Sequence, residues 1–533
     1  MISSSATRLL AIAIAAYLST SLASPLRARD DSVKLEGVKY VNKGLVGFGR
    51  IPSDFRESTG DTLGGIGSAI AFKRGTWTKN TDGTYAGTLV VRPDRGFNVE
   101  TTIDYQARQH DIDFILTPYT NSKKLSFDDA QKTLQLTYKS TILMFERNGV
   151  KTSGLDPLAV RPAQNGFPGV ADADPEMPIP SQDYSHLSLD VEGLVAAADG
   201  SYWISDEYGP YIYHFTADGN LISTIQPPAA ILPKDKNGNL NFTSEQNPTT
   251  GRSPNQGFEG LTIDFDNNIL YAMLQSATIQ DGGDDDSTSR HTRLVAYDVS
   301  ESDGSVRPAL VGEWVVPLPI SNDKGKTRAS SEIHFVSENV FLSLSRDGKG
   351  HGNDDSESKY KQADLFSIAT ATDIHGTEFD DPSNPVAPGG VLDSSIVPAT
   401  YVSFVDYIDD KQLARFGLHN GTCAPPQAPI PIPRNSGSTI SPPLSLLLAG
   451  GDFDEKLIDG KWESLAIAPV EDPESPDDYF LFTAADNDFI STHGVSLGVP
   501  FNAGDDVDTQ VFVFLVTLPS VPQGSIQRAL GVA

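Results

Sequence analysis

Residues 190–226, DVEGLVAAADGSYWISDEYGPYIYHFTADGNLISTIQ, decide the fold. The stretch holds four short apolar runs: Leu194–Ala198, Tyr202–Ser205, Tyr211–Phe215 and Leu221–Thr224. Turn residues rich in glycine and aspartate separate the runs, and such turns let consecutive strands double back as hairpins. The pattern therefore predicts one four-stranded antiparallel meander, which is the size of a propeller blade.

Acidic residues lie at the ends of these predicted strands. Glu192 precedes the first strand, and Asp206 and Glu207 follow the second. In an antiparallel pair, the start of one strand lies beside the end of the next. We therefore expect the three carboxylates to meet on one face.

A repeat extends this pattern along the chain. A glutamate followed by Gly, Ser or Ile and then by apolar residues recurs at Glu192, Glu259, Glu332 and Glu463, and the last interval is close to twice the others. Internal repeats of strand units indicate a radial array, whose closure removes exposed sheet edges. Stacked β-sandwiches are the alternative, but they give no reason for the recurring glutamate. An α/β-hydrolase fold is disfavoured because no convincing helical period exceeds two turns.

The repeat predicts an all-β propeller of four-stranded antiparallel blades over residues 65–519, with long loop insertions. In the first unit, Gly65–Glu146, we expect four strands: Ile66–Phe72, Thr88–Arg92, Thr101–Gln106 and Leu134–Tyr138. Five units are visible, and residues 398–450 leave room for a sixth. Because the last unit lacks an outer strand, we expect Val38–Val41, in the lead-in 24–64, to fill it and close the ring. Residues 420–445 form a Pro/Ser-rich insertion, and residues 520–533 form a C-terminal tail.

Residues 1–23 have the features of a secretory signal peptide. Arg8 supplies the positive charge, Leu9–Leu18 the apolar stretch and Ser21-Leu22-Ala23 the cleavage site. No later stretch approaches the roughly 18 apolar residues of a membrane span. We therefore expect a secreted, extracellular protein without a membrane anchor, glycosylated at the sequons of Asn241 and Asn420.

The amino-acid composition and net charge limit the kinds of molecule that the protein can bind. The formal net charge of −30 argues against nucleic acid and anionic membranes, which attract basic surfaces. The same charge suits a soluble secreted protein or one that binds cations. Cys423 is the only cysteine, so an intramolecular disulfide is excluded. The oligomeric state stays open.

The propeller prediction gathers acidic residues around the axis, because the first strand of each blade lines it. The candidate metal ligands are Glu192, Glu259, Glu332, Glu463, Asp486 and Asp488. Several carboxylates cannot converge without a large rise in pKa unless arginines or a cation neutralise them. Ca²⁺ is the natural cation for an all-oxygen site in a secreted protein.

Residues that end second strands add candidate chemistry. The candidate catalytic residues are Asp206, Glu207, Arg95 and Arg346, and the candidate substrate-binding residues are Arg95, Arg346 and Asn255. A guanidinium matches phosphate oxygens bidentately. Two alternatives stay open: each glutamate accepts backbone hydrogen bonds that lock blade to blade, and each arginine pairs with a neighbouring blade.

Four motifs resemble the family called "esterase-like activity of phytase". They are Glu192-Gly193-Leu194 with Trp203-Ile204-Ser205-Asp206-Glu207-Tyr208-Gly209-Pro210; Asn255-Gln256-Gly257-Phe258-Glu259-Gly260-Leu261 with Leu274-Gln275-Ser276; Leu344-Ser345-Arg346-Asp347; and Trp462-Glu463-Ser464-Leu465 with Asp486-Asn487-Asp488. The likeness covers about residues 65–516. Family members often carry an acidic residue where this chain has Ser345, and the fifth unit has Glu-Ser in place of Glu-Gly. The resemblance implies hydrolysis of phosphate or other esters.

Three functions follow as hypotheses. The first is a secreted hydrolase of phosphoesters or other esters that uses a divalent cation at the acidic ring, with a small ester or phosphoester as its substrate. The second is a non-catalytic propeller that binds a ligand or protein through the same face, since fold does not set function. The third is an enzyme similar to the calcium-dependent propeller lactonases, for which Asn255 and Asn487 are the available amides.

Overall fold

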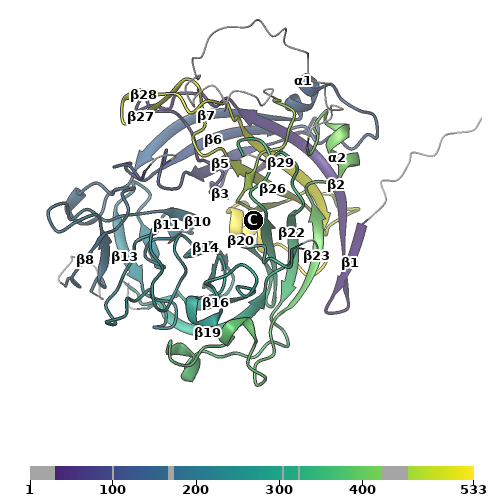
Figure 1. The fold of residues 1–533 in the computed structure, drawn as a ribbon. Coiled ribbons are helices and arrows are strands. Elements are labelled where there is room, and N and C mark those ends of the chain that lie inside the picture. Colours follow the sequence, from purple (N-terminus) through teal and green to yellow (C-terminus); the bar gives the residue numbers. More distant parts are fainter. Residues whose placement is uncertain are drawn as a thin grey trace, which may run out of the picture.

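Five antiparallel sheets form a closed ring around one axis (Figure 1). The structure is a computed structural model that describes residues 31–98, 101–165, 173–302, 305–321, 324–353, 355–421 and 454–533. The predicted signal peptide, Cys423 and nearly all of the predicted Pro/Ser-rich insertion lie outside the described residues. The sheets confirm the predicted β-propeller, and the number of blades is five.

Each blade has four strands, which follow one another from the axis outwards. Blade 1 has β3 (Ala69–Phe72), β5 (Tyr85–Arg92), β6 (Arg108–Leu116) and β7 (Leu134–Leu143). Blade 2 has β10 (Val191–Ala196), β11 (Tyr202–Asp206), β12 (Ile212–Phe215) and β13 (Leu221–Ile225). Blade 3 has β14 (Phe258–Asp264), β15 (Ile269–Leu274), β16 (His291–Asp298) and β19 (Ala309–Pro317). Blade 4 has β20 (Ser330–Ser337), β21 (Val340–Arg346), β22 (Lys361–Ser367) and β23 (Thr400–Asp406), and blade 5 has β25 (Ala466–Pro469), β26 (Asp478–Asp486), β29 (Thr509–Thr517) and β2 (Val38–Ile51).

Short strands and helices lie outside the four-stranded blades. The short strands are β1 (Asp31–Leu35), β4 (Thr78–Lys79), β8 (Ala159–Arg161), β9 (Met177–Ile179), β17 (Glu301–Ser302), β18 (Ser305–Val306), β24 (Lys461–Trp462), β27 (Gly494–Ser496) and β28 (Val499–Phe501). The α-helices are α1 (Phe127–Ala130), α2 (Asp410–Arg415) and α3 (Ser525–Leu530). None of the helices in the described part of the chain is long and apolar enough to cross a membrane.

The ring is closed by pairing the two ends of the chain. β2 pairs antiparallel with β29 from Val41–Thr517 to Ile51–Thr509 and is the outer strand of blade 5. The segment Val38–Val41, which the sequence analysis expected to close the ring, begins this strand, but only Val41 of it pairs with β29 and the closing pairs continue to Ile51. The closure leaves no open edge between the first and last blades, which would otherwise be a site for aggregation.

The third strand of blade 1 differs from its prediction. The strand expected at Thr101–Gln106 is instead β6, at Arg108–Leu116. The first half of β6 is polar, so it lacks the apolar pattern by which a buried strand is recognised in a sequence. Its Arg108 is nevertheless buried, because it forms ion pairs with Glu57 and Asp61. Residues 398–421 add no sixth blade, because β23 completes blade 4.

Apolar side chains fill the space between neighbouring blades. Between blades 2 and 3, Trp203 and Ile212 lie in one cluster with Phe258 and Leu261. Burying one such large side chain stabilises the fold by about 1.5 to 3 kcal/mol. The blades therefore hold their inner strands at set positions around the axis.

Candidate functional site

Each recurring glutamate of blades 2 to 4 lies where its inner strand begins. The pairing of the inner strand with its neighbour is irregular there, between Val191 and Leu194, between Phe258 and Gly260, and between Ser330 and Glu332. Such bulges re-aim side chains. The glycine after Glu192 is required by packing, because a Cβ on Gly193 would lie 2.4 Å from Leu261 Cβ of the next blade.

Three carboxylates of blade 2 meet at this end of the axis. Asp190 and Glu192 lie at the start of β10, Glu207 follows β11, and Val191 pairs with Asp206 between them. One carboxylate oxygen from each of the three lies within 4.8 Å of the others. We call Asp190, Glu192 and Glu207 the axial cluster. Of the three carboxylates that the sequence predicted to meet, Glu192 and Glu207 do so, and the third member is Asp190 in place of Asp206.

The axial cluster is buried and incompletely paired. Asp190, Glu192 and Glu207 are 1%, 6% and 2% exposed. Asp190 Oδ1 and Glu207 Oε1 lack hydrogen-bond partners. Arg95 Nη1 lies 2.9 Å from Asp190 Oδ2 as an ion pair.

Burial dominates the electrostatics of this cluster. It raises the pKa of Glu192 well above its usual value, and the charges of Glu259 and Glu207 raise it further. Burial also raises the pKa of Glu207 to about 8, with Asp190 adding to the rise and Arg95 opposing it. Without a further positive charge, the three groups therefore resist being ionised together.

A second carboxylate cluster lies at the same end and contains its own cation. One oxygen from each of Asp94, Asp486 and Asp488 lies within 4.8 Å of the others. Lys461 Nζ lies 2.8 Å from Asp486 Oδ2, 2.7 Å from Asp488 Oδ1 and 3.6 Å from Glu463 Oε1. We call Asp94, Asp486 and Asp488 the lysine cluster. Burial lowers the pKa of Lys461, but these aspartates outweigh it and raise the pKa well above its usual value.

Two of the predicted site residues are engaged by the backbone instead. Glu332 Oε1 accepts hydrogen bonds from Leu261 N at 2.9 Å and Ile333 N at 2.8 Å. These hydrogen bonds are the blade-locking alternative to the predicted role of Glu332 as a metal ligand, and they engage one of its two oxygens. Asp206 accepts from Asp190 N at 2.7 Å and Gly209 N at 3.1 Å. Asp206 therefore orders the loop that carries Glu207, which conflicts with a catalytic role for Asp206.

Both predicted arginines pair with carboxylates of a neighbouring blade. Arg95 follows blade 1 and pairs with Asp190 of blade 2, and Arg346 of blade 4 pairs with Glu463 of blade 5. In each arginine, Nε is buried without a hydrogen-bond partner. Each arginine thus has one guanidinium nitrogen in an ion pair with a carboxylate of the next blade, which is the alternative that the sequence analysis left open.

The predicted amides have different surroundings. Asn255 Oδ1 is buried without a hydrogen-bond partner, and Asn255 has a left-handed φ of 51°. Glu259 Oε2 is likewise unpartnered, while its Oε1 accepts from the Gln275 side chain. Asn487 instead accepts from Gly65 N at 2.9 Å and donates to Val507 O at 2.8 Å. Asn487 is therefore structural, which weakens the lactonase ligand set.

Sequence reasoning missed three residues of this end. Asp190 and Lys461 each stand two positions before a repeat glutamate, and alignment of the repeats on that position could have found them. Arg252 is fully buried and donates to Tyr208 O at 2.7 Å through Nη2 and at 3.1 Å through Nε. It supports the loop after Glu207, and no pattern in the sequence marks it.

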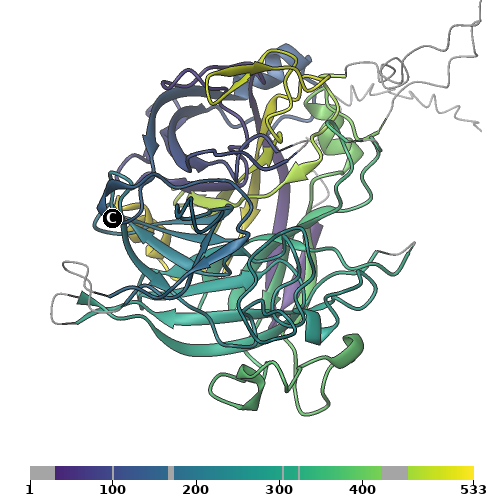
Figure 2. The ribbon, with the colours of Figure 1, turned by 60° about the vertical axis from the view of Figure 1, so that its left-hand side comes forward.

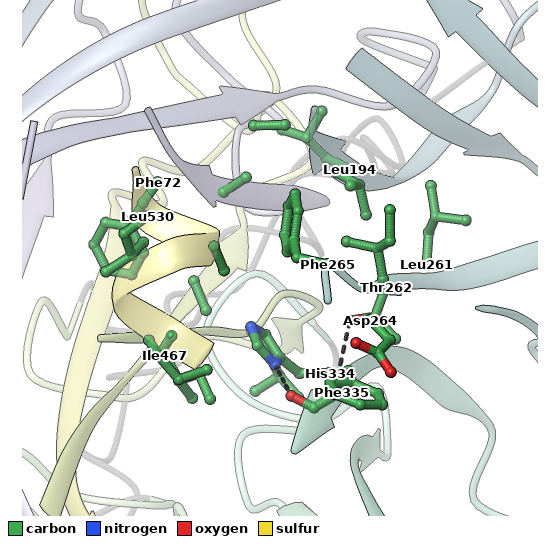
Figure 3. Close-up of a pocket in the computed structure, with 18 of the residues that line it drawn as sticks. Phe72, Leu194, Leu261, Thr262, Asp264, Phe265, His334, Phe335, Ile467 and Leu530 are labelled. Atoms are coloured by element: carbon green, nitrogen blue, oxygen red, sulfur yellow. Dashed lines mark hydrogen bonds between the residues drawn. The ribbon is translucent and has the colours of Figure 1, made fainter. Parts of the chain in front are cut away.

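The opposite end of the axis is apolar. Figure 3 shows a pocket there, lined by inner-strand residues such as Leu194 and Ile467 and covered by Leu530 of α3. Its volume is about 90 Å³. In Figure 2 the chain terminus beside α3 likewise lies at one end of the ring. The two ends of the axis therefore differ in chemistry: carboxylates gather at one end, and the apolar side chains of α3, Ile526 and Leu530, cover the other.

These features define a class of protein: a five-bladed β-propeller with a buried carboxylate and arginine site at one end of its axis. The chain belongs to the family described as esterase-like activity of phytase, whose model matches residues 62–404. A secreted protein of Arthroderma benhamiae is 36% identical over 494 residues, covering 86% of this chain and 89% of that protein.

Two solved structures are more distant. A luciferin-regenerating enzyme is 10% identical with a TM-score of 0.25, covering 85% of this chain and 92% of its own. A glycosyl hydrolase from Bacteroides ovatus is 8% identical with a TM-score of 0.29, covering 88% and 93%. Neither score is high enough to support an argument.

Proposed function

We propose that this chain is a secreted hydrolase of esters or phosphoesters that works with a divalent cation at the acidic end of the propeller axis. Family membership supports the class of reaction. One observation carries the proposal: three buried carboxylates, two of them with an unpaired oxygen, lie beside Arg95, whose buried Nε has no hydrogen-bond partner. Titratable groups perturbed in this way cluster at functional sites.

In this proposal, the residues at the acidic end have different roles in binding and reaction. A bound cation supplies Lewis acidity toward a phosphoryl or acyl oxygen and lowers the pKa of a bound water. Arg95 and Arg346 hold the anionic part of the substrate, because guanidinium groups bind phosphate and carboxylate oxygens bidentately. Asn255 offers a hydrogen bond to the substrate, and Arg252 keeps the loop of Glu207 in place.

Export is part of this proposal. The relative from Arthroderma benhamiae is named as a secreted protein, and residues 1–23 match a signal peptide. Ca²⁺ is the cation that an extracellular all-oxygen site would bind.

A substrate panel tests the proposal. The purified protein is assayed on phosphomonoesters including phytate, on carboxylic esters and on lactones, with Ca²⁺ or with a chelator. Arg346→Lys keeps the charge but loses the bidentate fork, so kcat/KM should fall at least about tenfold, or about 1.4 kcal/mol. Arg528→Lys, at the exposed apolar end, is the matched control and should keep wild-type activity.

The same panel separates the alternatives. Turnover of lactones alone would favour a lactonase, and saturable ligand binding without turnover would favour a non-catalytic propeller. Flat activity on every substrate, with and without Ca²⁺, would overturn the hydrolase proposal.

A further inference from the structure

We propose that Ca²⁺ binds to the axial cluster of Asp190, Glu192 and Glu207, and that Lys461 keeps the lysine cluster free of metal. The inference deepens the proposed function by giving its cation a place. It rests on that function only for what the ion does in the reaction, so binding can be tested apart from turnover.

The spacing of the oxygens fits calcium. Ca²⁺ binds oxygen ligands at about 2.3 to 2.6 Å, so ligands on opposite sides of the ion are about 4.6 to 5.2 Å apart. The three oxygens of the axial cluster lie within 4.8 Å of one another. Three carboxylates leave further positions of the ion for water or a substrate oxygen, because Ca²⁺ takes about six to eight ligands.

Unpaired oxygens point to a ligand at this cluster and not to an acidic patch alone. Asp190 Oδ1 and Glu207 Oε1 belong to side chains that are only 1% and 2% exposed, and neither accepts a hydrogen bond. Glu259 Oε2, in a residue 3% exposed, is also unpartnered, and the charge of Glu259 adds to the rise in the pKa of Glu192. Buried polar atoms without partners are costly, and a cation removes that cost.

The lysine cluster is the internal comparison. One oxygen from each of its three aspartates likewise lies within 4.8 Å of the others. The Lys461 ammonium, however, already lies within hydrogen-bond distance of Asp486 and Asp488. In the axial cluster, Arg95 pairs with Asp190 alone. No ion pair to Glu192 or Glu207 occurs within the described ranges of the chain. Lys461 bridges two carboxylates of the lysine cluster. No cation bridges the carboxylates of the axial cluster in this way within the described residues, although the charges of Arg95 and Arg252 act on Glu207.

Calcium titration of the full mature protein tests the inference. The protein is stripped with EDTA, dialysed, and titrated with CaCl₂ by calorimetry, with MgCl₂ as the comparison. We expect one saturable Ca²⁺ site per chain that Glu207→Gln weakens at least about tenfold, because affinity follows the number of charged ligands. Asp488→Asn, in the lysine cluster, is the matched control and should bind Ca²⁺ as the wild type does.

Two further variants keep the test decisive. Glu192→Gln should reproduce the loss if Glu207→Gln folds poorly by circular dichroism. Lys461→Met should raise the stoichiometry from one ion to two, because it removes the ammonium from three carboxylates. The calcium site is overturned if the wild type shows no saturable binding, if neither glutamine variant weakens Ca²⁺ binding, or if Asp488→Asn abolishes Ca²⁺ binding. The role given to Lys461 is overturned if Lys461→Met still binds one ion per chain.

The outcomes also separate this inference from the proposed function. Calcium binding at the axial cluster without any turnover supports the site and removes the hydrolase. Turnover that is unaffected by chelation and by Glu207→Gln removes the site and leaves the hydrolase.

Discussion

At the scale of single residues, Glu332 shows how a repeated glutamate serves structure. Its Oε1 accepts from Leu261 of the neighbouring blade and from Ile333. Glu332→Ala should destabilise the protein by about 1 to 3 kcal/mol for each buried N–H left unpaired. Glu332→Gln should cost less, because it keeps an acceptor and burial already favours the uncharged form by raising the pKa of Glu332. Denaturant unfolding measures both, with the exposed Glu338→Ala as control; a drop in calcium affinity in Glu332→Gln would contradict this assignment.

The two sequons differ at the same scale. Asn420 Nδ2, the atom that would carry a glycan, donates to Ser358 O at 2.9 Å, and Asn420 Oδ1 accepts from Ser358 N at 2.9 Å. Asn241 is half-buried beside Phe242. We expect a glycan at Asn241 and little at Asn420, because glycosylation there competes with both hydrogen bonds. Glycopeptide mass spectrometry measures site occupancy, and a fully occupied Asn420 in the folded secreted protein would refute the expectation.

At the scale of elements, α3 closes the apolar end of the axis. Leu530 is 6% exposed and lines the pocket of about 90 Å³. Leu530→Ala should lower the free energy of unfolding by about 2 to 5 kcal/mol, since it adds a cavity to the lost apolar burial. Arg528→Ala on the same helix breaks an exposed ion pair to Asp266, and such pairs contribute only about 0 to 1 kcal/mol. Equal effects of the two substitutions in chemical denaturation would mean that α3 does not close the axis through its apolar face.

At the scale of the whole molecule, buried carboxylates set how stability depends on pH. Burial raises the pKa of Asp364 to about 7, and Tyr360 and Phe404 hydrogen-bond to the carboxyl. A pKa raised in the folded state gives stability that is complete below the unfolded value, about 3.9, and is lost as pH rises through about 7.

Asp364→Asn should therefore flatten this dependence. The stability of the wild type relative to Asp364→Asn should fall between about pH 4 and pH 7, because only the wild type must release a proton from a buried site. Thermal unfolding at about pH 4.5, 6 and 8 measures the difference, and exposed Asp128→Asn is the control. A wild type that gains on Asp364→Asn as pH rises would show that Asp364 is stabilised as the anion.

Much of the fold could be predicted from the sequence because blades are local objects. The four strands of blade 2 follow one another within residues 191–225 and are joined by short turns, so apolar runs and turn residues suffice to find them. The prediction for β6 is wrong because its polar residues are buried by partners far along the chain, such as Glu57 for Arg108.

The site was predicted less completely for a physical reason. Glu332 and Asp206 accept backbone hydrogen bonds, and Glu192 lies in the axial cluster. Each of the other predicted metal, catalytic and substrate-binding residues has a buried atom without a partner or an ion pair. Sequence spacing shows which acidic residues share the acidic end, but it does not show which of them meet a cation. That depends on contacts between blades, such as Arg346 with Glu463.

The sequence by itself determined the class of fold, the repeat around the axis and the gathering of carboxylates at one end, because hairpins and repeats are encoded over short distances. Only the tertiary structure decided that five blades close through β2, that Lys461 neutralises the lysine cluster and that Asp190 completes the axial cluster. The reason is that these contacts form only in the folded chain: Lys461 meets Asp486 across paired strands of blade 5, and Arg95 of blade 1 reaches Asp190 of blade 2.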